Sequence, residues 1–313
     1  MIEHVLADIL RDVAGLARRV GRLETPEVTT AALLPAVLPS ANLLTNPGLE
    51  IWQRGSGGFT ATNAYTADRW QILLGGTSTV TVTREGTTID GASLYAAKAV
   101  YVQGSANSQI DQLIEDFTQL RGKTLTLSVR VRQGVASNVR PYISDSGAKT
   151  YGTASATTGS YVTLMVSLAI GAAATSVRVG IDLGASDTVY LDNAILTIGS
   201  LTPTYRPLHP ADDLARCQRY FEVQGGVTNS DIDYQGYTSA AQELRFARSC
   251  VPKAVVPTIT RVGTWSLTNV AGQPTVDVPG TNSYRLRFTS SGAGLAEVNT
   301  VDTTTYISIE ANP

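Results

Sequence analysis

The side chains that carry out catalysis in most enzymes are scarce in this sequence. An enzyme needs a nucleophile beside a base, a pair of carboxylic acids, or a bound metal. The chain has two histidines, His4 and His209, and neither has a neighbour that completes a dyad or a set of metal ligands. Two carboxylates could still meet in the folded chain as a glycosidase pair, which keeps a glycan depolymerase among the hypotheses. We expect a protein that is not an enzyme.

Two glycine-containing segments imitate nucleotide-binding loops without completing them. Gly122-Lys123-Thr124 matches the end of a phosphate-binding loop, but Phe117 stands where that loop needs its first glycine. The run Gly55-Ser56-Gly57-Gly58 has Thr60 in place of the last glycine of a dinucleotide fingerprint. Neither segment predicts a nucleotide site.

Composition excludes two classes of partner. The 313 residues carry a net charge of −2, and the basic residues are scattered, so we expect no nucleic acid. No apolar run reaches the roughly 18 residues of a membrane span, so we expect no membrane insertion. Cys217 and Cys250 are the only cysteines. They either form a disulfide or remain buried and reduced, and the second alternative is favoured for a protein made in a cytoplasm.

Alternating apolar and polar residues predict strands from residue 42 to residue 200. Such runs mark strands with one buried face, and eight to ten of them occur between turn residues, with no helical pattern among them. We predict a two-sheet β-sandwich of the jelly-roll type. Clear examples are Leu125-Leu127-Val129-Val131, Val162-Leu164-Val166-Leu168 and Val177-Val179-Ile181-Leu183.

A short helix and a second β domain follow. Residues 201–222 contain a linker and a helix over 211–221, where Leu214, Cys217, Tyr220 and Phe221 share one face. Asp212 and Asp213 lie in its first turn, where the helix dipole favours carboxylates. Residues 223–313 return to strand-like patterns and predict a smaller β domain of five to seven strands. The fold class is therefore mostly β.

The first 24 residues carry a heptad repeat. Leu6, Val13 and Val20 occupy the a positions, and Ile2, Ile9, Leu16 and Leu23 occupy the d positions. We predict a parallel trimeric coiled coil over 1–24, with Leu6, Ile9, Val13, Leu16, Arg19, Val20, Leu23 and Glu24 at its interface. The alternative is an amphipathic helix that docks on the same chain. Residues 25–41 contain three prolines and predict an extended tether.

The trimer rests on a short run within this repeat. Arg19-Val20-Gly21-Arg22-Leu23-Glu24 resembles the Arg-hydrophobic-x-x-hydrophobic-Glu pattern of short trimeric coiled coils. In that pattern the arginine stem covers the apolar seam while its guanidinium meets the glutamate of the next chain.

Two segments at the ends of the predicted sandwich resemble jelly-roll carbohydrate-binding modules. The run 42–50, Asn-Leu-Leu-Thr-Asn-Pro-Gly-Leu-Glu, is similar to their opening strand, and the run 189–194, Val-Tyr-Leu-Asp-Asn-Ala, to their closing strand. The resemblance implies that the first and last strands lie together, often beside a structural calcium. Glu50 and Asp192 would then be its side-chain ligands, completed by backbone carbonyls. The alternative is that both groups only cap a turn and help to pair the termini.

The same resemblance extends to structural proteins of bacteriophages. Ile51-Trp52-Gln53-Arg54-Gly55 and Tyr65-Thr66-Ala67-Asp68-Arg69-Trp70 are similar to a group of such proteins, which often continue with a segment like 211–221. The likeness covers roughly residues 42–221 and implies a virion location.

Aromatic rings are the candidate glycan contacts, because the C–H face of a sugar stacks on a ring. Trp52 and Trp70 lie inside the resembling segments, where a core position is the stronger alternative. Tyr142 and Tyr151 flank the segment 144–147, Ser-Asp-Ser-Gly, which favours exposed rings.

These inferences lead to one main functional hypothesis. The sequence predicts a homotrimeric phage virion protein, a tail fibre or appendage. It would be anchored to other virion proteins through residues 1–41 and would contact a host surface glycan. A capsid decoration or cement protein is the alternative, and the glycan depolymerase is the third.

Overall fold

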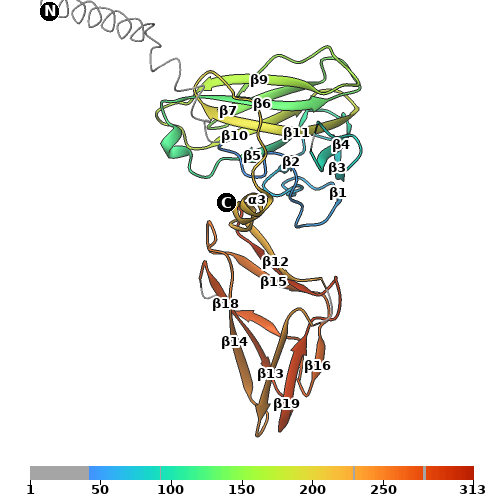
Figure 1. The fold of residues 1–313 in the computed structure, drawn as a ribbon, viewed down its shortest axis with the longest axis vertical. Coiled ribbons are helices and arrows are strands. Elements are labelled where there is room, and N and C mark those ends of the chain that lie inside the picture. The colour runs from blue at the N-terminus through green and yellow to red at the C-terminus, as the bar shows by residue number, and fades with distance from the viewer. Residues whose placement is uncertain (1–41, 92, 228–229, 278–279) are drawn as a thin grey trace, which may run out of the picture. The chain divides into compact units, whose positions relative to one another are not determined.

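The computed structural model describes residues 42–91, 93–227, 230–277 and 280–313 (Figure 1). The predicted coiled coil over 1–24 and the tether over 25–41 lie outside the described residues, so the trimer stays a prediction. The described part of the chain is mostly β, as the alternating runs predict, with twenty strands, one α-helix and one 3-10 helix. Within that part, no helix is long and apolar enough to cross a bilayer.

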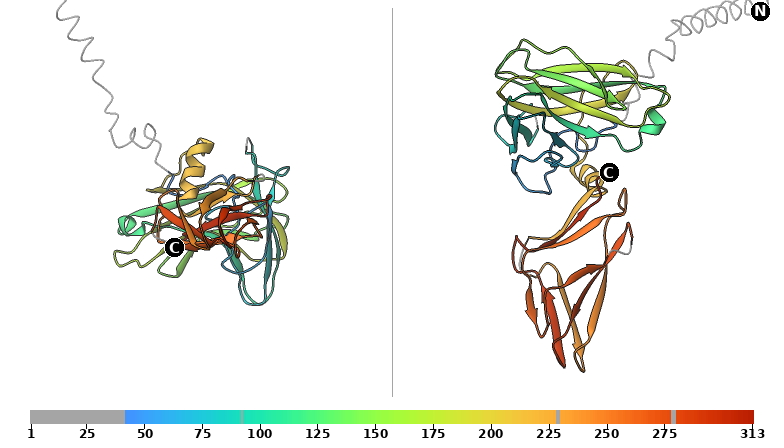
Figure 2. Two further views of the ribbon diagram at one scale, coloured as in Figure 1. Left: turned by 90° about the horizontal axis from the view of Figure 1, so that it is seen from below. Right: turned by 180° about the vertical axis from the view of Figure 1, so that it is seen from behind.

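Residues 42–200 form two antiparallel sheets that face each other across one core (Figure 2). The first sheet has six strands in the order β1-β3-β4-β11-β6-β9. Its strands are β1 (Gly57–Phe59), β3 (Thr79–Glu85), β4 (Ala96–Val102), β11 (Asp187–Ile198), β6 (Thr124–Arg132) and β9 (Val162–Ala169).

The second sheet has five strands in the order β2-β5-β10-β7-β8. They are β2 (Gln71–Leu73), β5 (Ser108–Leu113), β10 (Val177–Leu183), β7 (Val139–Asp145) and β8 (Ala148–Tyr151). The 3-10 helix η1 (Phe117–Leu120) joins β5 to β6. Together the two sheets form the β-sandwich that the sequence predicts. They contain eleven strands rather than the predicted eight to ten. The prediction is too low because β1 and β2 have only three residues each, which is too short to show an alternating pattern.

Period-two alternation builds the core of the sandwich. Leu125, Leu127, Val129 and Val131 of β6 are buried, and the residues between them point to the opposite face of the sheet. The aliphatic residues of β10 and β11 meet them from the two sheets in one cluster. Burial of such aliphatic side chains contributes about 1.5–3 kcal/mol each, so this cluster is the main source of stability in the sandwich.

The two ends of the sandwich sequence lie together, as the resemblance implies. The amide of Leu43 donates to the carbonyl of Leu196 over 2.9 Å, and the amide of Ala194 donates to the carbonyl of Pro47 over 2.8 Å. The side chain of Asn42 links the segment that contains Leu43 to β11, because its Oδ1 accepts the amide of Leu196 over 3.0 Å.

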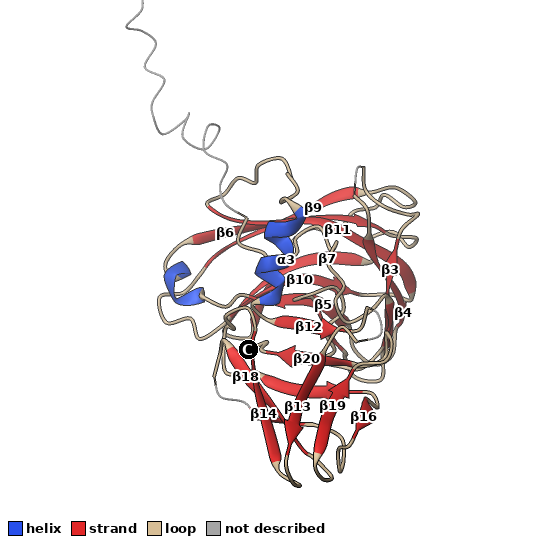
Figure 3. Cartoon of the chain, turned by 60° about the horizontal axis from the view of Figure 1, so that its bottom comes forward, coloured by secondary structure: helices blue, strands red, loops and turns tan. Residues whose placement is uncertain are grey.

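One α-helix, α3 (Pro210–Gln218), follows the sandwich (Figure 3). Pro210 occupies its first turn, and the His209 side chain accepts the amide of Ala211 as an N-cap. The sequence predicts a helix to Phe221, but α3 ends at Gln218. The reason is that Phe221 pairs with Glu310 in a sheet. Leu214 is 36% exposed, so it does not share the buried face predicted for it.

Three small antiparallel sheets of three strands each follow α3. The sequence predicts five to seven strands here, and this count is too low because strands of three to five residues leave little pattern. The sheets are β12 (Phe221–Gly225) with β20 (Tyr306–Glu310) and β15 (Thr258–Val262); β13 (Asp233–Thr238) with β19 (Gly294–Asn299) and β16 (Ser266–Thr268); and β14 (Glu243–Ser249) with β18 (Ser283–Thr289) and β17 (Thr275–Asp277). A second apolar cluster around Trp265, Tyr284 and Leu286 joins these sheets.

Candidate functional site

A cleft of about 570 Å³ lies over the outer face of the six-stranded sheet. Its floor comes from β6, β9 and β11, and its walls come from the loop before β4 and the segment after β11. Most of its side chains carry hydroxyl, amide, carboxylate or guanidinium groups: Glu50, Asp90, Ser93, Ser128, Arg130, Thr163, Asn193, Thr202, Thr204 and Tyr205.

An ion pair between Asp90 and Arg130 lies in this cleft. Arg130 donates Nε to Oδ2 of Asp90 over 2.7 Å and Nη2 to Oδ1 over 2.9 Å, a bidentate arrangement. Its Nη1 donates to Oγ1 of Thr163 over 3.1 Å. The hydrogen bonds from Arg130 hold the pKa of the Asp90 carboxyl below its usual value, so this carboxylate stays ionised at neutral pH.

A bulge in β11 places Asn193 beside this pair. The register of β11 against β6 shifts between Asp192 and Ile195, and Asn193 takes a left-handed backbone with φ 42°. Asparagine tolerates that conformation better than most residues. Its Nδ2 donates to Oδ2 of Asp90 over 3.2 Å and to Oγ of Ser93 over 3.1 Å. The closing strand motif therefore supplies a cleft residue through an irregularity of the sheet.

The two predicted calcium ligands lie beside the same loop. Glu50 accepts the amides of Leu94 over 2.8 Å and Tyr95 over 3.0 Å. Asp192 accepts the amide of Asp90 over 3.0 Å and the hydroxyl of Ser93 over 3.2 Å. These contacts perform the capping role that the sequence left open as the alternative.

The chemistry of this pair is compatible with a cation. Burial, and to a smaller extent the charge of Glu50, raise the pKa of the Asp192 carboxyl to about 7. A calcium ion would offset both effects, and carboxylate oxygens are ligands that it prefers. In the described part of the chain, no group of three acidic, histidine or cysteine side chains is arranged to hold a metal, so backbone carbonyls would have to complete the shell. The calcium site at Glu50 and Asp192 stays a prediction.

The tryptophans proposed as glycan contacts belong to the core, which corrects that proposal. Trp70 is fully buried and donates Nε1 to the carbonyl of Asn46 over 2.9 Å. Trp52 is 7% exposed and donates Nε1 to the carbonyl of Leu49 over 2.6 Å. A ring without an exposed face cannot stack on a sugar, so the alternative that favoured the core is correct.

The two tyrosines around the predicted loop differ from each other. Ser146 and Gly147 form a tight turn between β7 and β8, with φ values of 52° and 91°, which places Tyr142 opposite Tyr151. Tyr142 is fully buried and donates its hydroxyl to Asp111, so it is not an exposed ring. Tyr151 is 40% exposed, but the guanidinium of Arg140 lies 4.3 Å from its ring centre. Neither tyrosine lines the cleft.

The segments that resemble phage proteins join the sandwich to the strands after α3. The guanidinium of Arg54 lies 3.6 Å from the ring centre of Phe221 and pairs with Glu310 over 2.5 Å. Its Nη1 lies 3.5 Å from Oδ1 of Asp68, a carboxyl whose pKa burial raises to about 6. Gln53 donates to the carbonyl of Phe221 over 2.8 Å. The Gln53-Arg54 dipeptide thus has a structural role that sequence reasoning did not identify.

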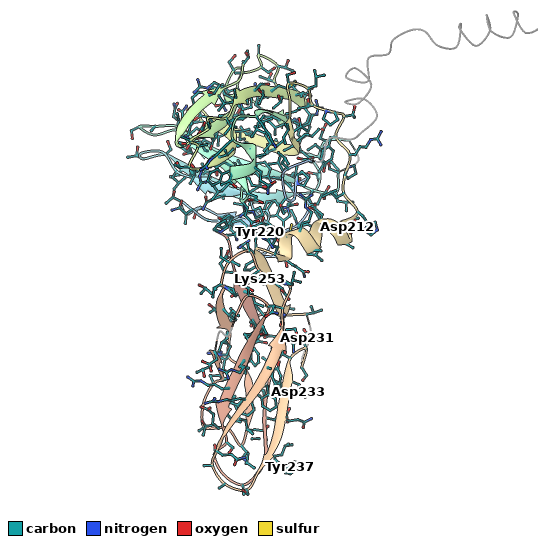
Figure 4. The ribbon with its side chains drawn as sticks, turned by 90° about the vertical axis from the view of Figure 1, so that its left-hand side faces the viewer. Asp212, Tyr220, Asp231, Asp233, Tyr237 and Lys253 are labelled. Carbon is teal, nitrogen blue, oxygen red and sulfur yellow. The ribbon has the colours of Figure 1, made fainter. Side chains whose placement is uncertain are left out.

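Arg69 makes a parallel set of contacts in this junction. Its guanidinium lies 3.9 Å from the ring centre of Tyr220, and its Nη1 donates to Oδ1 of Asn312 over 2.9 Å. Tyr220 donates its hydroxyl to Glu115, and the buried Lys253 donates Nζ to Oε2 of Glu222 over 2.6 Å (Figure 4). Each arginine thus combines a ring contact with a polar partner near the carboxyl end of the chain.

Both cysteines are free and buried, as the favoured alternative predicts. Cys217 lies on α3, and Cys250 follows β14. Burial raises the pKa of each thiol, which keeps them protonated and unreactive at neutral pH.

No protein-family model matches this chain, and no curated protein matches it. Among solved structures, it is similar to the CBM22-1 xylan-binding domain of Xyn10C from Paenibacillus barcinonensis, at 13% identity and a TM-score of 0.37, over 52% of this chain and 97% of that one. It is similar to TmCBM61, solved with β-1,4-galactotriose, at 16% identity and a TM-score of 0.35, over 51% of this chain and 100% of that one. It is also similar to the enzymatically active domain of bacteriophage CBA120 tailspike protein 4, at 12% identity and a TM-score of 0.35, over 50% of this chain and 21% of that one. The structural neighbours thus include carbohydrate-binding modules and a phage tailspike domain.

Proposed function

We propose that this protein is a homotrimeric attachment protein of a bacteriophage particle, a tail fibre or appendage, which binds a host surface glycan through the cleft on the six-stranded sheet. Residues 1–41 would anchor it to other virion proteins. The observation that carries the glycan-binding part is the polar lining of the cleft around Asp90, Arg130 and Asn193.

The cleft has groups that suit a sugar. Each hydroxyl of a sugar both donates and accepts a hydrogen bond, so a matching site needs fixed donors and acceptors side by side. Asp90 provides acceptors, Arg130 and Asn193 provide donors, and the ion pair holds all three in place. Tyr205 adds an aromatic ring to the wall, and a volume of about 570 Å³ is within the usual range for a ligand site.

The carboxyl groups near the cleft favour binding over hydrolysis. A glycosidase needs a protonated acid that reaches the substrate. Asp192 has a suitably raised pKa, but it is fully buried and its oxygens accept internal donors. Asp90 is held ionised by Arg130, and both oxygens of Glu50 accept backbone amides. We therefore propose a non-catalytic protein, and sugar release from a host polysaccharide would contradict this.

A trimer would strengthen weak sugar contacts. Once one of the three sites of a trimer has bound a repeating glycan surface, the other two sites meet further sugars at a high effective concentration. The overall affinity of the trimer then exceeds that of one site by about 10²–10⁴-fold where the geometry permits. A monomeric mass for the full chain in solution would remove this part of the proposal.

The glycan-binding test uses one substitution at two matched positions. Asn193→Gly removes the amide that holds Asp90 and Ser93, and glycine keeps the left-handed backbone. Asn269→Gly is the control, because Asn269 has φ 50° and also donates to its neighbours, but lies after β16, outside the sandwich. On a glycan array, we expect the full chain and Asn269→Gly to bind alike. Asn193→Gly should lose about 10-fold in apparent affinity, since hydrogen bonds to charged groups contribute about 1.5–3 kcal/mol. No binding by the full chain, or equal binding by both variants, overturns the proposal.

The virion location is tested by imaging intact particles with gold-labelled antibody raised to residues 212–313. Label on the tail or baseplate supports an attachment protein. Label spread over the head favours the capsid decoration protein instead, and unlabelled particles contradict both.

A further inference from the structure

A row of three side chains crosses the outer face of the six-stranded sheet next to the cleft. In the register of the sheet, Tyr190 of β11 stands opposite Lys98 of β4 on one side and Arg132 of β6 on the other. All three are partly exposed, whereas the next residues along their strands, such as Val131, Ala97 and Val189, are buried in the core. The three side chains therefore share the solvent face of the sheet.

The two cations of this row have no carboxylate partner within the part of the chain that the structure describes. Among the described residues, no carboxylate forms an ion pair with Lys98 or Arg132. Arg130, two residues before Arg132 on the same face, is by contrast paired with Asp90. Arg132 donates Nε to the carbonyl of Gly159 over 2.9 Å, and in the described structure its two Nη groups have no hydrogen-bond partner. They are thus available to an outside acceptor.

The spacing of the three side chains fits a ligand that consists of one sugar ring with a negative charge at its edge. The guanidinium carbon of Arg132 lies over one face of the Tyr190 ring, 5.4 Å from its centre, so a sugar would stack on the opposite face. Neighbouring strands are about 4.8 Å apart, which places Lys98 and Arg132 roughly 10 Å from each other with Tyr190 between them. A pyranose stacked on Tyr190 would bring a carboxylate on its edge within reach of one cation.

We propose that Lys98, Tyr190 and Arg132 form a subsite for an acidic sugar that carries a carboxylate, such as a uronic acid residue. This inference rests on the proposed glycan-binding function and names the class of ligand. The two free Nη groups of Arg132 match a carboxylate in a bidentate manner, and Lys98 adds a second positive charge. A polysaccharide chain that enters the cleft at Arg130 would reach the row after one step along β6, from Arg130 to Arg132.

The test compares carboxylated polysaccharides with carboxyl-reduced forms of the same polymers. Polygalacturonic acid and its reduced, uncharged form are a suitable first pair, measured with the full-length chain at low and high salt. We expect at least about 10-fold tighter binding of the acidic form, with an affinity that falls as salt rises. Equal binding of the two forms overturns the acidic subsite but leaves glycan binding intact. No binding of any glycan on the array overturns both.

A double variant locates the effect. Lys98→Gln with Arg132→Gln should remove the preference for the carboxylated form and leave binding of the reduced form unchanged. Lys123→Gln with Arg245→Gln is the matched control, because both residues are exposed, lie outside the row and carry the same total charge. A preference that survives the first variant, or that is lost equally in the control, contradicts the assignment. A preference for sulfated over carboxylated polymers would also overturn it.

Discussion

The buried carboxyl of Asp192 should make the stability of the sandwich depend on pH in the direction opposite to that of most carboxylates. Burial, and the nearby charge of Glu50, raise its pKa from 3.8 to about 7 in the folded chain. Between these two values the folded state holds a proton that the unfolded state has released. Unfolding therefore releases a proton, and a rise in pH favours the unfolded state.

The magnitude follows from the size of the shift. A difference of about 3 pH units corresponds to roughly 4 kcal/mol, since one unit is worth about 1.4 kcal/mol. Asp192 should therefore contribute its full stability below about pH 4 and lose it progressively up to about pH 7. For a protein of 313 residues, 4 kcal/mol corresponds to a change in Tm of roughly 6 °C.

The assay is urea unfolding of the wild type and of Asp192→Asn at several pH values between 4 and 8, followed by the fluorescence of the buried tryptophans. A calcium chelator is present throughout, because a calcium ion at Asp192 would lower the pKa of its carboxyl. Asparagine does not ionise, so the difference in unfolding free energy between the two proteins isolates the Asp192 proton. The asparagine amide would face the amide of Asp90, which adds a cost that is the same at every pH. We expect the wild type to lose about 4 kcal/mol relative to the variant as the pH rises from 4 to 7.5.

Asp187→Asn provides the control. Asp187 lies on the same strand and also accepts backbone amides, from Gly134 and Val135, but it is half-exposed. A difference between wild type and Asp192→Asn that stays constant within about 1 kcal/mol across this pH range would refute the reasoning.

Three further predictions concern other parts of the chain. A calcium chelator should lower the Tm of the wild type but not that of Glu50→Gln with Asp192→Asn, and equal sensitivity of both proteins would show that no calcium is held there. Arg54→Ala should lower the unfolding free energy by about 2 kcal/mol, because a desolvated contact with the Phe221 ring and an ion pair are lost; an unchanged urea midpoint would contradict this. Gly147→Ala should lower the unfolding free energy by about 1 kcal/mol, because the φ of Gly147 is 91°. Gly272→Ala should lower it less, because Gly272 has open space around it and no left-handed backbone. Thermal unfolding of the two variants tests this difference.

The regular strands of the sandwich could be predicted from the sequence, because alternation with period two is a local property. The runs that begin at Leu125, Val162 and Val177 correspond to β6, β9 and β10. The end of α3 could not be predicted in the same way. Its apolar spacing continues to Phe221, but the pairing of Phe221 with Glu310 ends the helix at Gln218, and that pairing joins residues far apart in the sequence.

The cleft could be predicted even less, because it forms from segments that no local pattern connects. Asp90 and Arg130 lie 40 residues apart, and each is unremarkable in its own segment. Asn193 was within a motif that the sequence singled out, but its position in the cleft depends on a bulge in β11. For Trp52 and Trp70, residue type alone suggested a ligand contact, and their burial confirms the core position that the sequence analysis favoured.

The pairing of β12 with β20 has a consequence for any experiment that attaches a label or a fused domain. These strands are the first and the last of the region after α3, so the chain enters and leaves that region side by side, and Asn312 is held by Arg69 of the sandwich. A tag joined after Pro313 would therefore report on the neighbourhood of α3, where Figure 1 marks the carboxyl terminus. The turn after β13 lies at the end of this region that is farther from α3, next to Tyr237, which is 81% exposed (Figure 4). A probe inserted in that turn would report on this far end.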